Sequence, residues 1–116
     1  MIIGIIGYGV VGKAIENTLS KIHDIRIYDP FNEHYSDFSK MVGCNQIFVS
    51  VPTPYDYSLK KVVLTAVDEN ILRLDRINFK GIIIIKSTVP PGTTDYYIDK
   101  YDLQIVHNPE FLREST

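Results

Sequence analysis

The sequence predicts an α/β fold built on a doubly wound parallel sheet of five strands. Short runs rich in Ile and Val alternate along the chain with segments whose apolar residues recur at helical spacing. Continuous apolar runs of this kind are typical of strands buried on both faces, as in parallel sheets. The length of 116 residues, with 45% hydrophobic and 22% charged side chains, suits one ordinary globular domain. We therefore treat residues 1–116 as a single domain.

The elements can be assigned in chain order. Strands are predicted at residues 2–6, 24–28, 46–51, 81–85 and 103–106. Apolar spacing predicts a helix at 11–22 after the first strand, and another at 59–74 after the third, with Ser58 as its N-cap. A shorter helix is predicted at 36–42, and the Pro-Pro-Gly that ends the fourth strand predicts a last helix at 93–100. This alternation implies right-handed crossovers with helices on both faces of the sheet.

A glycine-rich turn, Gly-Tyr-Gly-Val-Val-Gly at residues 7–12, joins the first predicted strand to the first predicted helix. In this context Gly7 makes a tight turn, Gly9 lets the backbone approach a pyrophosphate, and Gly12 lets the helix pack closely on the strand. Val10 and Val11 lie at the helix start, where free amides and the helix dipole favour an anion. The pattern predicts a Rossmann-like dinucleotide-binding site.

Asp29 indicates which dinucleotide is expected. It ends the second predicted strand about twenty residues beyond Gly9, the offset at which an acid accepts hydrogen bonds from the adenosine ribose. Its neighbours Pro30 and Phe31 supply no cation for a 2′-phosphate, so we predict NAD in preference to NADP. Two alternatives stay open from these residues alone: a glycine-cornered turn without a ligand, and a flavin or S-adenosylmethionine site on a similar fold.

Charge and cysteine content argue against several other classes of function. A net charge of -2 and a pI near 5.8 leave no electrostatic footprint for nucleic acid or an anionic membrane. Cys44 is the only cysteine, so an intrachain disulfide is excluded, and we predict no metal site. The start lacks a basic region with a cleavage site, and the run at 82–85 is too short to span a bilayer. We expect a soluble, cytoplasmic protein.

Three further segments follow predicted strands, at the carboxyl ends where open α/β sheets bind ligands. They are Val-Pro-Thr-Pro at 51–54, Lys-Ser-Thr-Val-Pro-Pro-Gly-Thr at 86–93 and His-Asn-Pro-Glu-Phe-Leu-Arg-Glu at 107–114. With the glycine turn and Asp29, they resemble, in order from residue 1 to residue 114, the N-terminal domain of the UDP-glucose/GDP-mannose 6-dehydrogenase family. The resemblance implies an enzyme that uses NAD to oxidise the C6 hydroxyl of a nucleotide sugar twice, to a uronic acid, through a thioester on a cysteine.

The resemblance also implies roles for particular residues on the cofactor side. Residues that match cofactor contacts are, besides the glycine turn and Asp29, Val51, Pro52, Thr53, Ser87 and Thr88. Thr88 further matches a threonine that helps to hold the water and the alcohol at the reacting carbon. Judged from residue type alone, Thr53 and Thr88 are equally well explained as turn formers beside proline.

The last segment carries the residues that the resemblance assigns to the substrate and to catalysis. Glu110 matches a glutamate associated with water activation and thioester hydrolysis, and Glu114 matches a second active-site glutamate. Phe111 and Leu112, together with Glu110, match the stretch that contacts the sugar nucleotide. Partial burial raises the pKa of a carboxyl group toward neutral pH, and a general base in such a reaction requires a pKa in that range. The alternative reading is that both glutamates are solvated acids in the first turn of a helix.

The chain departs from the family pattern in two places. The connection between Asp29 and Gln46 is short where the family has a longer insert with an additional strand, so we predict the strand order 2-1-3-4-5 with its switch point between strands one and three. The family's nucleophilic cysteine, and the lysine and asparagine that assist it, lie in a C-terminal domain that residues 1–116 do not include. Cys44 precedes the third strand, at the opposite pole, and is expected to be a small buried hydrophobe.

These departures lead to an expectation about function and partners. We expect half of a split dehydrogenase or a remnant, inactive as an isolated chain. The alternatives are a stand-alone NAD-binding or redox-sensing module, and a small dehydrogenase or imine-reductase-like subunit completed by dimerisation. The predicted strand at 103–106 would be a sheet edge, with Phe111 and Leu112 exposed beside it, and such an edge invites pairing. We therefore expect a homo-oligomer or a complementing chain to bind through residues 103–114, and a nucleotide sugar to bind in the completed site.

Overall fold

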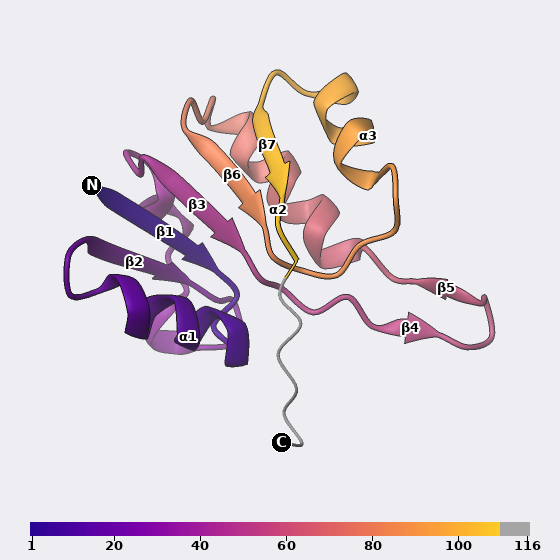
Figure 1. The fold of residues 1–116 in the computed structure, drawn as a ribbon, viewed down its shortest axis with the longest axis horizontal. Helices are drawn as coiled ribbons and strands as arrows, with labels where there is room; N and C mark the ends of the chain where they lie inside the picture. Colours follow the sequence, from indigo (N-terminus) through magenta and orange to yellow (C-terminus); the bar gives the residue numbers. More distant parts are fainter. Residues whose placement is uncertain (110–116) are drawn as a thin grey trace.

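The computed structural model describes residues 1–109, and a parallel five-stranded sheet lies at its centre (Figure 1). The sheet has the order β2-β1-β3-β6-β7, and every neighbouring pair is parallel. Counted along the chain without the short hairpin β4-β5, this is the predicted order 2-1-3-4-5, which is confirmed. The strands are β1 (Ile2–Ile6), β2 (Asp24–Tyr28), β3 (Gln46–Val49), β6 (Ile82–Ile85) and β7 (Gln104–His107).

Helices cover both faces of this sheet, as predicted. On one face, the helix α1 (Val10–Leu19) approaches β1 so closely that a Cβ on Gly12 would lie 3.3 Å from the side chain of Ile5. On the other face, Ile71 of α2 (Thr65–Arg76) belongs to the same buried cluster as Ile6. Because successive strand residues point to opposite faces, α1 and α2 lie on opposite sides of the sheet, as Figure 1 shows.

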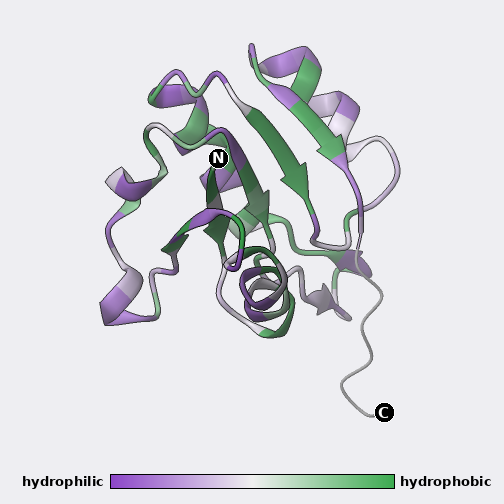
Figure 2. Ribbon diagram, turned by 60° about the vertical axis from the view of Figure 1, so that its left-hand side comes forward, coloured by the Kyte–Doolittle hydropathy of each residue, from purple (hydrophilic) through white to green (hydrophobic). Residues whose placement is uncertain are grey.

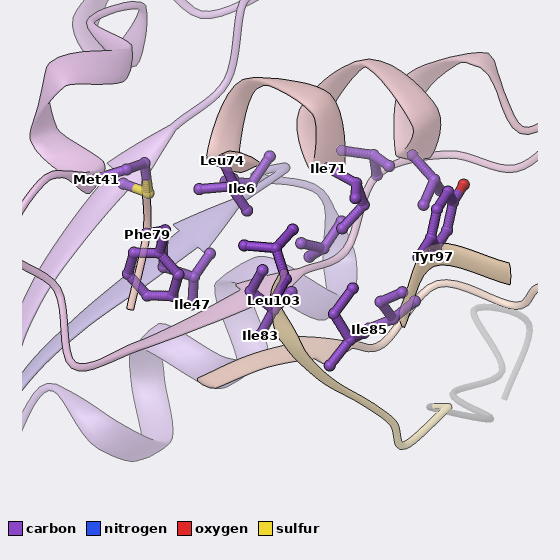
Figure 3. Packing of buried hydrophobic residues seen from close by; sticks show 14 of the residues in the cluster. Ile6, Met41, Ile47, Ile71, Leu74, Phe79, Ile83, Ile85, Tyr97 and Leu103 are labelled. Atoms are coloured by element: carbon purple, nitrogen blue, oxygen red, sulfur yellow. The ribbon is translucent and has the colours of Figure 1, made fainter. Parts of the chain in front are cut away.

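Most of the core lies between the sheet and the helix α2, on the side of the sheet that we call the α2 face (Figure 3). Strand β6 is four consecutive isoleucines, of which Ile83 and Ile85 are fully buried in this cluster, while Ile82 on the α1 face is 38% exposed. Hydrophobic residues are concentrated in the strands (Figure 2). The third helix, α3 (Thr93–Lys100), has the predicted bounds and adds the buried Tyr97 to the cluster.

The short helix predicted at 36–42 is wrong as an α-helix. The chain there forms two separate 3₁₀ turns, η1 (Glu33–Tyr35) and η2 (Phe38–Met41). Each turn is started by its own side-chain cap: Asn32 accepts the amide of His34, and Asp37 accepts the amide of Ser39. Closely spaced capping residues of this kind restart the chain and prevent one continuous helix.

The helix predicted at 59–74 begins later than expected, because a β-hairpin replaces its first turns. The strands β4 (Tyr55–Asp56) and β5 (Lys61–Val62) pair in antiparallel orientation and project from the carboxyl end of the sheet (Figure 1). The helix α2 starts only at Thr65, and its N-cap position, Leu64, makes no side-chain hydrogen bond. Ser58, predicted as the cap, instead lies in the hairpin turn.

Asp56 explains why these residues turn instead of forming a helix. Its Oδ1 accepts the amide of Ser58 at 2.9 Å and the amide of Leu59 at 3.0 Å, which fixes a tight turn. Lys60 then adopts a left-handed conformation with φ of 53°, which is incompatible with a right-handed helix. At the turn, the rings of Tyr55 and Tyr57 pack edge to face with centroids 4.9 Å apart. This aromatic pair is a surface contact, since Tyr57 is 84% exposed.

One edge of the sheet in the described part of the chain is β7, at the position predicted for the last strand. Its Ile105 is buried on the α2 face, whereas Val106 is 50% exposed on the α1 face, in register with Ile84 of β6. This strand has no proline and no Lys, Arg, Asp or Glu, which are residues that commonly protect an edge. Within residues 1–109, no helix has the length and apolar character needed to cross a bilayer.

Candidate functional site

The glycine turn lies at the carboxyl end of β1 and depends on glycine at two positions. Gly7 has φ of 96°, and a Cβ on it would lie 2.7 Å from the carbonyl oxygen of Ser50. A Cβ on Gly12 would lie 2.2 Å from the carbonyl oxygen of Gly7, so α1 packs directly against the turn. Ser50 at the end of β3 donates its hydroxyl to the Gly7 carbonyl at 2.8 Å. The tight turn and the close helix–strand contact are therefore at the positions that the sequence predicts.

Gly9 leaves free space at the start of α1. A Cβ built on it has no neighbouring atom within 4 Å, and no side chain caps the helix that follows. The first amides of a helix have no partner inside the helix, so those of Val10 and Val11 are available to a ligand. The first turn of α1 also contains no acidic residue that would repel an anion. The arrangement suits a negatively charged group placed against Gly9.

Asp29 lies beside this turn, immediately after β2, and its carboxylate is held by the backbone. Its Oδ2 accepts the amide of Tyr8, and its Oδ1 accepts the amide of Phe31, both at 2.9 Å. Each carboxylate oxygen has a further lone pair, so both oxygens can accept another hydrogen bond. The carboxylate is thus oriented before any ligand arrives and is suited to a pair of hydroxyl donors.

Tyr8 connects the glycine turn to α1 and to the segment after β2. Its hydroxyl donates to Oε1 of Glu16 at 2.5 Å, and this hydrogen bond to a carboxylate raises the pKa of Tyr8 to about 12. Its ring packs edge to face on Tyr35 with centroids 5.1 Å apart. The Tyr35 carbonyl in turn accepts the amide of Asp29 at 2.8 Å. These contacts fix the position of Asp29 relative to the glycine turn.

Two adjoining hollows meet along Gly9 and residues 50–52. The first, which we call the Asp29 groove, has a volume of about 510 Å³ and lies between the segment after β2 and the start of α2. Its walls are formed by Gly7, Tyr8, Gly9, Asp29, Pro30, Phe31, Ser50, Val51, Pro52, Pro54, Val63, Thr65, Ala66, Glu69 and Asn70. The second, the Thr88 hollow, has a volume of about 330 Å³. It is lined by Gly9, Val10, Val11, Ser50, Val51, Pro52, Thr53, Lys86, Ser87 and Thr88.

The loops after β3 and β6 are tied together beside the Thr88 hollow. Thr53 donates its hydroxyl to the carbonyl of Thr88 at 2.8 Å, and the buried Ser87 donates its hydroxyl to the carbonyl of Val51 at 2.7 Å. The Thr88 side chain itself is exposed. His107 at the end of β7 places its Nε2 3.2 Å from the Ser87 carbonyl. All the predicted cofactor residues except Gly12, which packs under the glycine turn, therefore line one or both of the two hollows, and Ser87 also serves as a structural link.

The α2 side of the Asp29 groove was not predicted from the sequence. Thr65, Ala66, Glu69 and Asn70 form this wall, and Asn70 is 7% exposed. The sequence did contain a signal that could have identified this wall, because Asn70 is a polar residue within the apolar stripe of a predicted helix. Arg73 was missed too: it lies in a neighbouring hollow of about 420 Å³, donating to the Tyr28 hydroxyl at 2.5 Å.

The predicted catalytic and substrate residues at the end of the chain are not all described. Thr88 lies in the hollow named after it, whereas Glu110, Phe111, Leu112 and Glu114 lie outside the described residues. Cys44 is 6% exposed and precedes β3, at the amino ends of the strands and away from both hollows. Burial raises the pKa of the Cys44 thiol, as expected for a small buried hydrophobe. Residues 1–109 contain no group of three or more potential metal ligands.

Comparison with known families decides how this arrangement is classified. Residues 16–116 match the model of the UDP-glucose/GDP-mannose dehydrogenase family, NAD binding domain. The chain belongs to this family. The matched range begins after the glycine turn, so the turn and its contacts are independent of that match. The family resemblance expected from the sequence is confirmed.

Individual proteins of the dehydrogenase family show the same relationship. The UDP-glucose 6-dehydrogenase of Campylobacter jejuni is 38% identical over 112 residues, which cover 90% of this chain and 28% of that protein. The UDP-glucose 6-dehydrogenase of Streptococcus pneumoniae is 37% identical over 68 residues, covering 58% of this chain and 17% of that protein. The chain therefore spans less than a third of these curated relatives.

The fold is shared with solved structures. A ternary complex of GDP-mannose dehydrogenase from Pseudomonas aeruginosa matches with a TM-score of 0.76 and 22% identity, over 99% of this chain and 37% of that one. The NDP-N-acetyl-D-galactosaminuronic acid dehydrogenase from Methanosarcina mazei matches with a TM-score of 0.74 and 15% identity, over 97% of this chain and 35% of that one. These likenesses establish the Rossmann-like fold of the dehydrogenase NAD domain.

The residues present fit the cofactor after which the family domain is named. A dinucleotide consists of two nucleosides joined by a pyrophosphate, and here two hollows are joined at the uncapped start of α1. Gly9 leaves open the space that a larger side chain would fill. Asp29 offers a fixed acceptor for ribose hydroxyls in one hollow.

Proposed function

We propose that this chain binds NAD across the two hollows and forms the cofactor side of a nucleotide-sugar 6-dehydrogenase site. The observation that carries this proposal is the position of Gly9 at the junction of the Asp29 groove and the Thr88 hollow. Open space, free helix amides and the absence of first-turn acids coincide at that junction.

Each part of the site has a distinct task in this proposal. The Asp29 carboxylate accepts hydrogen bonds from the adenosine ribose, and the amides of Val10 and Val11 bind the pyrophosphate. Thr53 and Ser87 tie together the loops after β3 and β6, between which we place the nicotinamide half. When bound, NAD supplies the ring that accepts a hydride from the alcohol carbon.

The substrate class is inferred from the relatives. The curated relatives described above carry the name UDP-glucose 6-dehydrogenase, and the GDP-mannose dehydrogenase shares the fold. We infer a nucleotide sugar of this class, oxidised at C6 to a uronate. In this proposal the exposed Thr88 hydroxyl holds the reacting alcohol or water, Glu110 and Glu114 act as the catalytic carboxylates, and Phe111 and Leu112 contact the sugar nucleotide.

A calorimetric titration of the chain with NAD, NADP and UDP-glucose tests this proposal. We expect NAD to bind and NADP to bind more weakly. We expect UDP-glucose to bind tightly only when the family's C-terminal domain supplies its substrate residues. A weak NAD affinity is compatible with the proposal, because affinity depends on how much of the ligand is enclosed. Absence of any NAD binding at millimolar concentration would contradict it.

The purified 116-residue chain is expected to form no NADH from UDP-glucose or GDP-mannose. Thioester chemistry requires a reactive cysteine at the substrate, and the only cysteine, Cys44, is 6% exposed and lies away from both hollows. The check is absorbance at the NADH wavelength, with a full-length relative as the positive control. Sustained NADH formation by this polypeptide would show that a different nucleophile serves the reaction.

We also propose that the edge strand β7 binds another polypeptide or a second copy. A Val106→Lys variant is expected to weaken this association, because Val106 is 50% exposed on the α1 face. Ile105 is unsuitable for the test, since its side chain is buried. The measurement is the mass in solution of both proteins, with NAD binding as the folding control. An unmutated chain that is monomeric at high concentration and captures no complementing polypeptide would favour the stand-alone NAD module instead.

A further inference from the structure

The buried stripe of α2 contains one polar side chain, that of Asn70. Val67, Ile71 and Leu74 are its apolar members, and they belong to the main core cluster. Asn70 is 7% exposed, which is as buried as many core residues, yet it also forms part of the wall of the Asp29 groove. A buried amide on an apolar helix face costs free energy unless its polar atoms find partners.

The hydrogen bonds of Asn70 leave one acceptor open. Its Nδ2 donates to the carbonyl of Ala66 at 2.8 Å, and its Oδ1 has no partner within residues 1–109. In the same range, every side-chain oxygen or nitrogen that is fully sealed from solvent has a partner. Oδ1 therefore remains accessible, and the groove wall is where Asn70 meets solvent. Oδ1 of Asn70 is therefore available to accept a hydrogen bond from a donor on a ligand.

The position of Asn70 along the groove indicates which part of the ligand it meets. Pro30, Glu69 and Asn70 line both the Asp29 groove and the neighbouring hollow that contains Arg73, whereas the glycine turn does not reach that second hollow. Asn70 thus lies where the groove adjoins the hollow of Arg73, whereas Gly9 lies where it adjoins the Thr88 hollow. A ribose bound at Asp29 with its phosphate at Gly9 places its base toward the Asn70 side of the groove.

We propose that Asn70 Oδ1 accepts a hydrogen bond from the 6-amino group of adenine and makes the site select adenine over a 6-oxopurine. The proposal rests on the proposed function, because it takes NAD as the occupant of the groove. One of the two Nδ2 hydrogens of Asn70 is donated to Ala66, and Oδ1 is the polar atom of this amide that has no partner within residues 1–109. Adenine offers an amino donor at position 6, whereas hypoxanthine offers a carbonyl oxygen whose lone pairs face Oδ1. Val63 and Ala66 provide apolar surface along the same wall.

The test compares NAD with nicotinamide hypoxanthine dinucleotide by calorimetry on the unmutated chain and on Asn70→Leu. The unmutated chain is expected to prefer NAD by about tenfold, because a mismatched acceptor leaves a buried group without its partner. Asn70→Leu has nearly the same size and is expected to reduce this ratio to about twofold or less by removing the acceptor. Asn70→Ala removes the acceptor without the leucine branch and is expected to give the same ratio.

Asn17→Leu is the matched control, since it makes the same replacement at an exposed position of α1 outside both hollows. It is expected to keep the ratio of the unmutated chain, and thermal melting verifies that every variant is folded. Equal affinity for both dinucleotides in the unmutated chain overturns the proposal, as does an unchanged ratio in Asn70→Leu and Asn70→Ala. If neither dinucleotide binds the unmutated chain, the proposed function fails, and the assignment of Asn70 fails with it.

Discussion

A Gly9→Ala variant is expected to bind NAD at least about tenfold more weakly while its melting temperature stays unchanged. The backbone of Gly9 is extended, with φ of -92°, so alanine fits it without strain, and the new Cβ meets no protein atom within 4 Å. The methyl group would instead occupy the space into which we place the pyrophosphate. Calorimetry with NAD and thermal melting on the same samples measure the two effects separately.

Gly12→Ala is the matched comparison, and its expected result is different. A Cβ at Gly12 would lie 2.2 Å from a backbone oxygen of the glycine turn, so α1 must shift away from β1. Overpacking of this kind costs about 1–3 kcal/mol of the free energy of unfolding, and binding is lost together with stability. If Gly9→Ala lowers stability as much as Gly12→Ala, or binds NAD normally, the placement of the pyrophosphate at Gly9 is wrong.

An Asp29→Asn variant is expected to narrow the difference in affinity between NAD and NADP. In the unmutated chain, the 2′-phosphate of NADP would face the Asp29 carboxylate as a like charge, whereas the free hydroxyl of NAD donates to it. The amide removes the charge, so binding of NAD weakens while binding of NADP weakens less or improves. The ratio of the two dissociation constants, measured at low salt, is the informative quantity.

This ratio separates recognition from a loss of order in the loop. Asp29 also accepts the amides of Tyr8 and Phe31, and any loosening of these contacts affects both dinucleotides alike. Arg73 lies in the neighbouring hollow, so Arg73→Gln provides a control for cationic help to NADP. Equal binding of NAD and NADP by the unmutated chain would contradict the role of Asp29.

Much of the fold could be predicted from the sequence because each strand of the main sheet has a recognisable local pattern of residues. Continuous Ile and Val runs located all five strands of the main sheet to within two residues, and Pro-Pro-Gly before Thr93 located α3. The glycine turn and Asp29 lie at fixed offsets from β1 and β2, so their meeting followed from topology. The order of the strands followed from the short connection between β2 and β3.

The errors arose where a side chain overrode apolar spacing. Leu59 and Val63 continue the helical spacing of α2 backward, yet the Asp56 carboxylate captures two amides and turns the chain. Apolar spacing alone predicts that Leu59 is buried, although its side chain is 62% exposed. The consequence concerns the site, because this hairpin places Pro54 and Val63 at the wall of the Asp29 groove. The wall contributed by α2 was missed for a different reason: its residues are far from the glycine turn in the sequence and meet it only in the folded structure.

The account depends most directly on where NAD contacts the chain, and amide chemical shifts measured during a titration of ¹⁵N-labelled protein with NAD test this. We predict shifts at Gly7, Gly9, Val10 and Asp29, with Asn70 at the adenine end, and none around Cys44 at the amino ends of the strands. Shifts confined to the Cys44 end, or none at saturating NAD, would contradict the account.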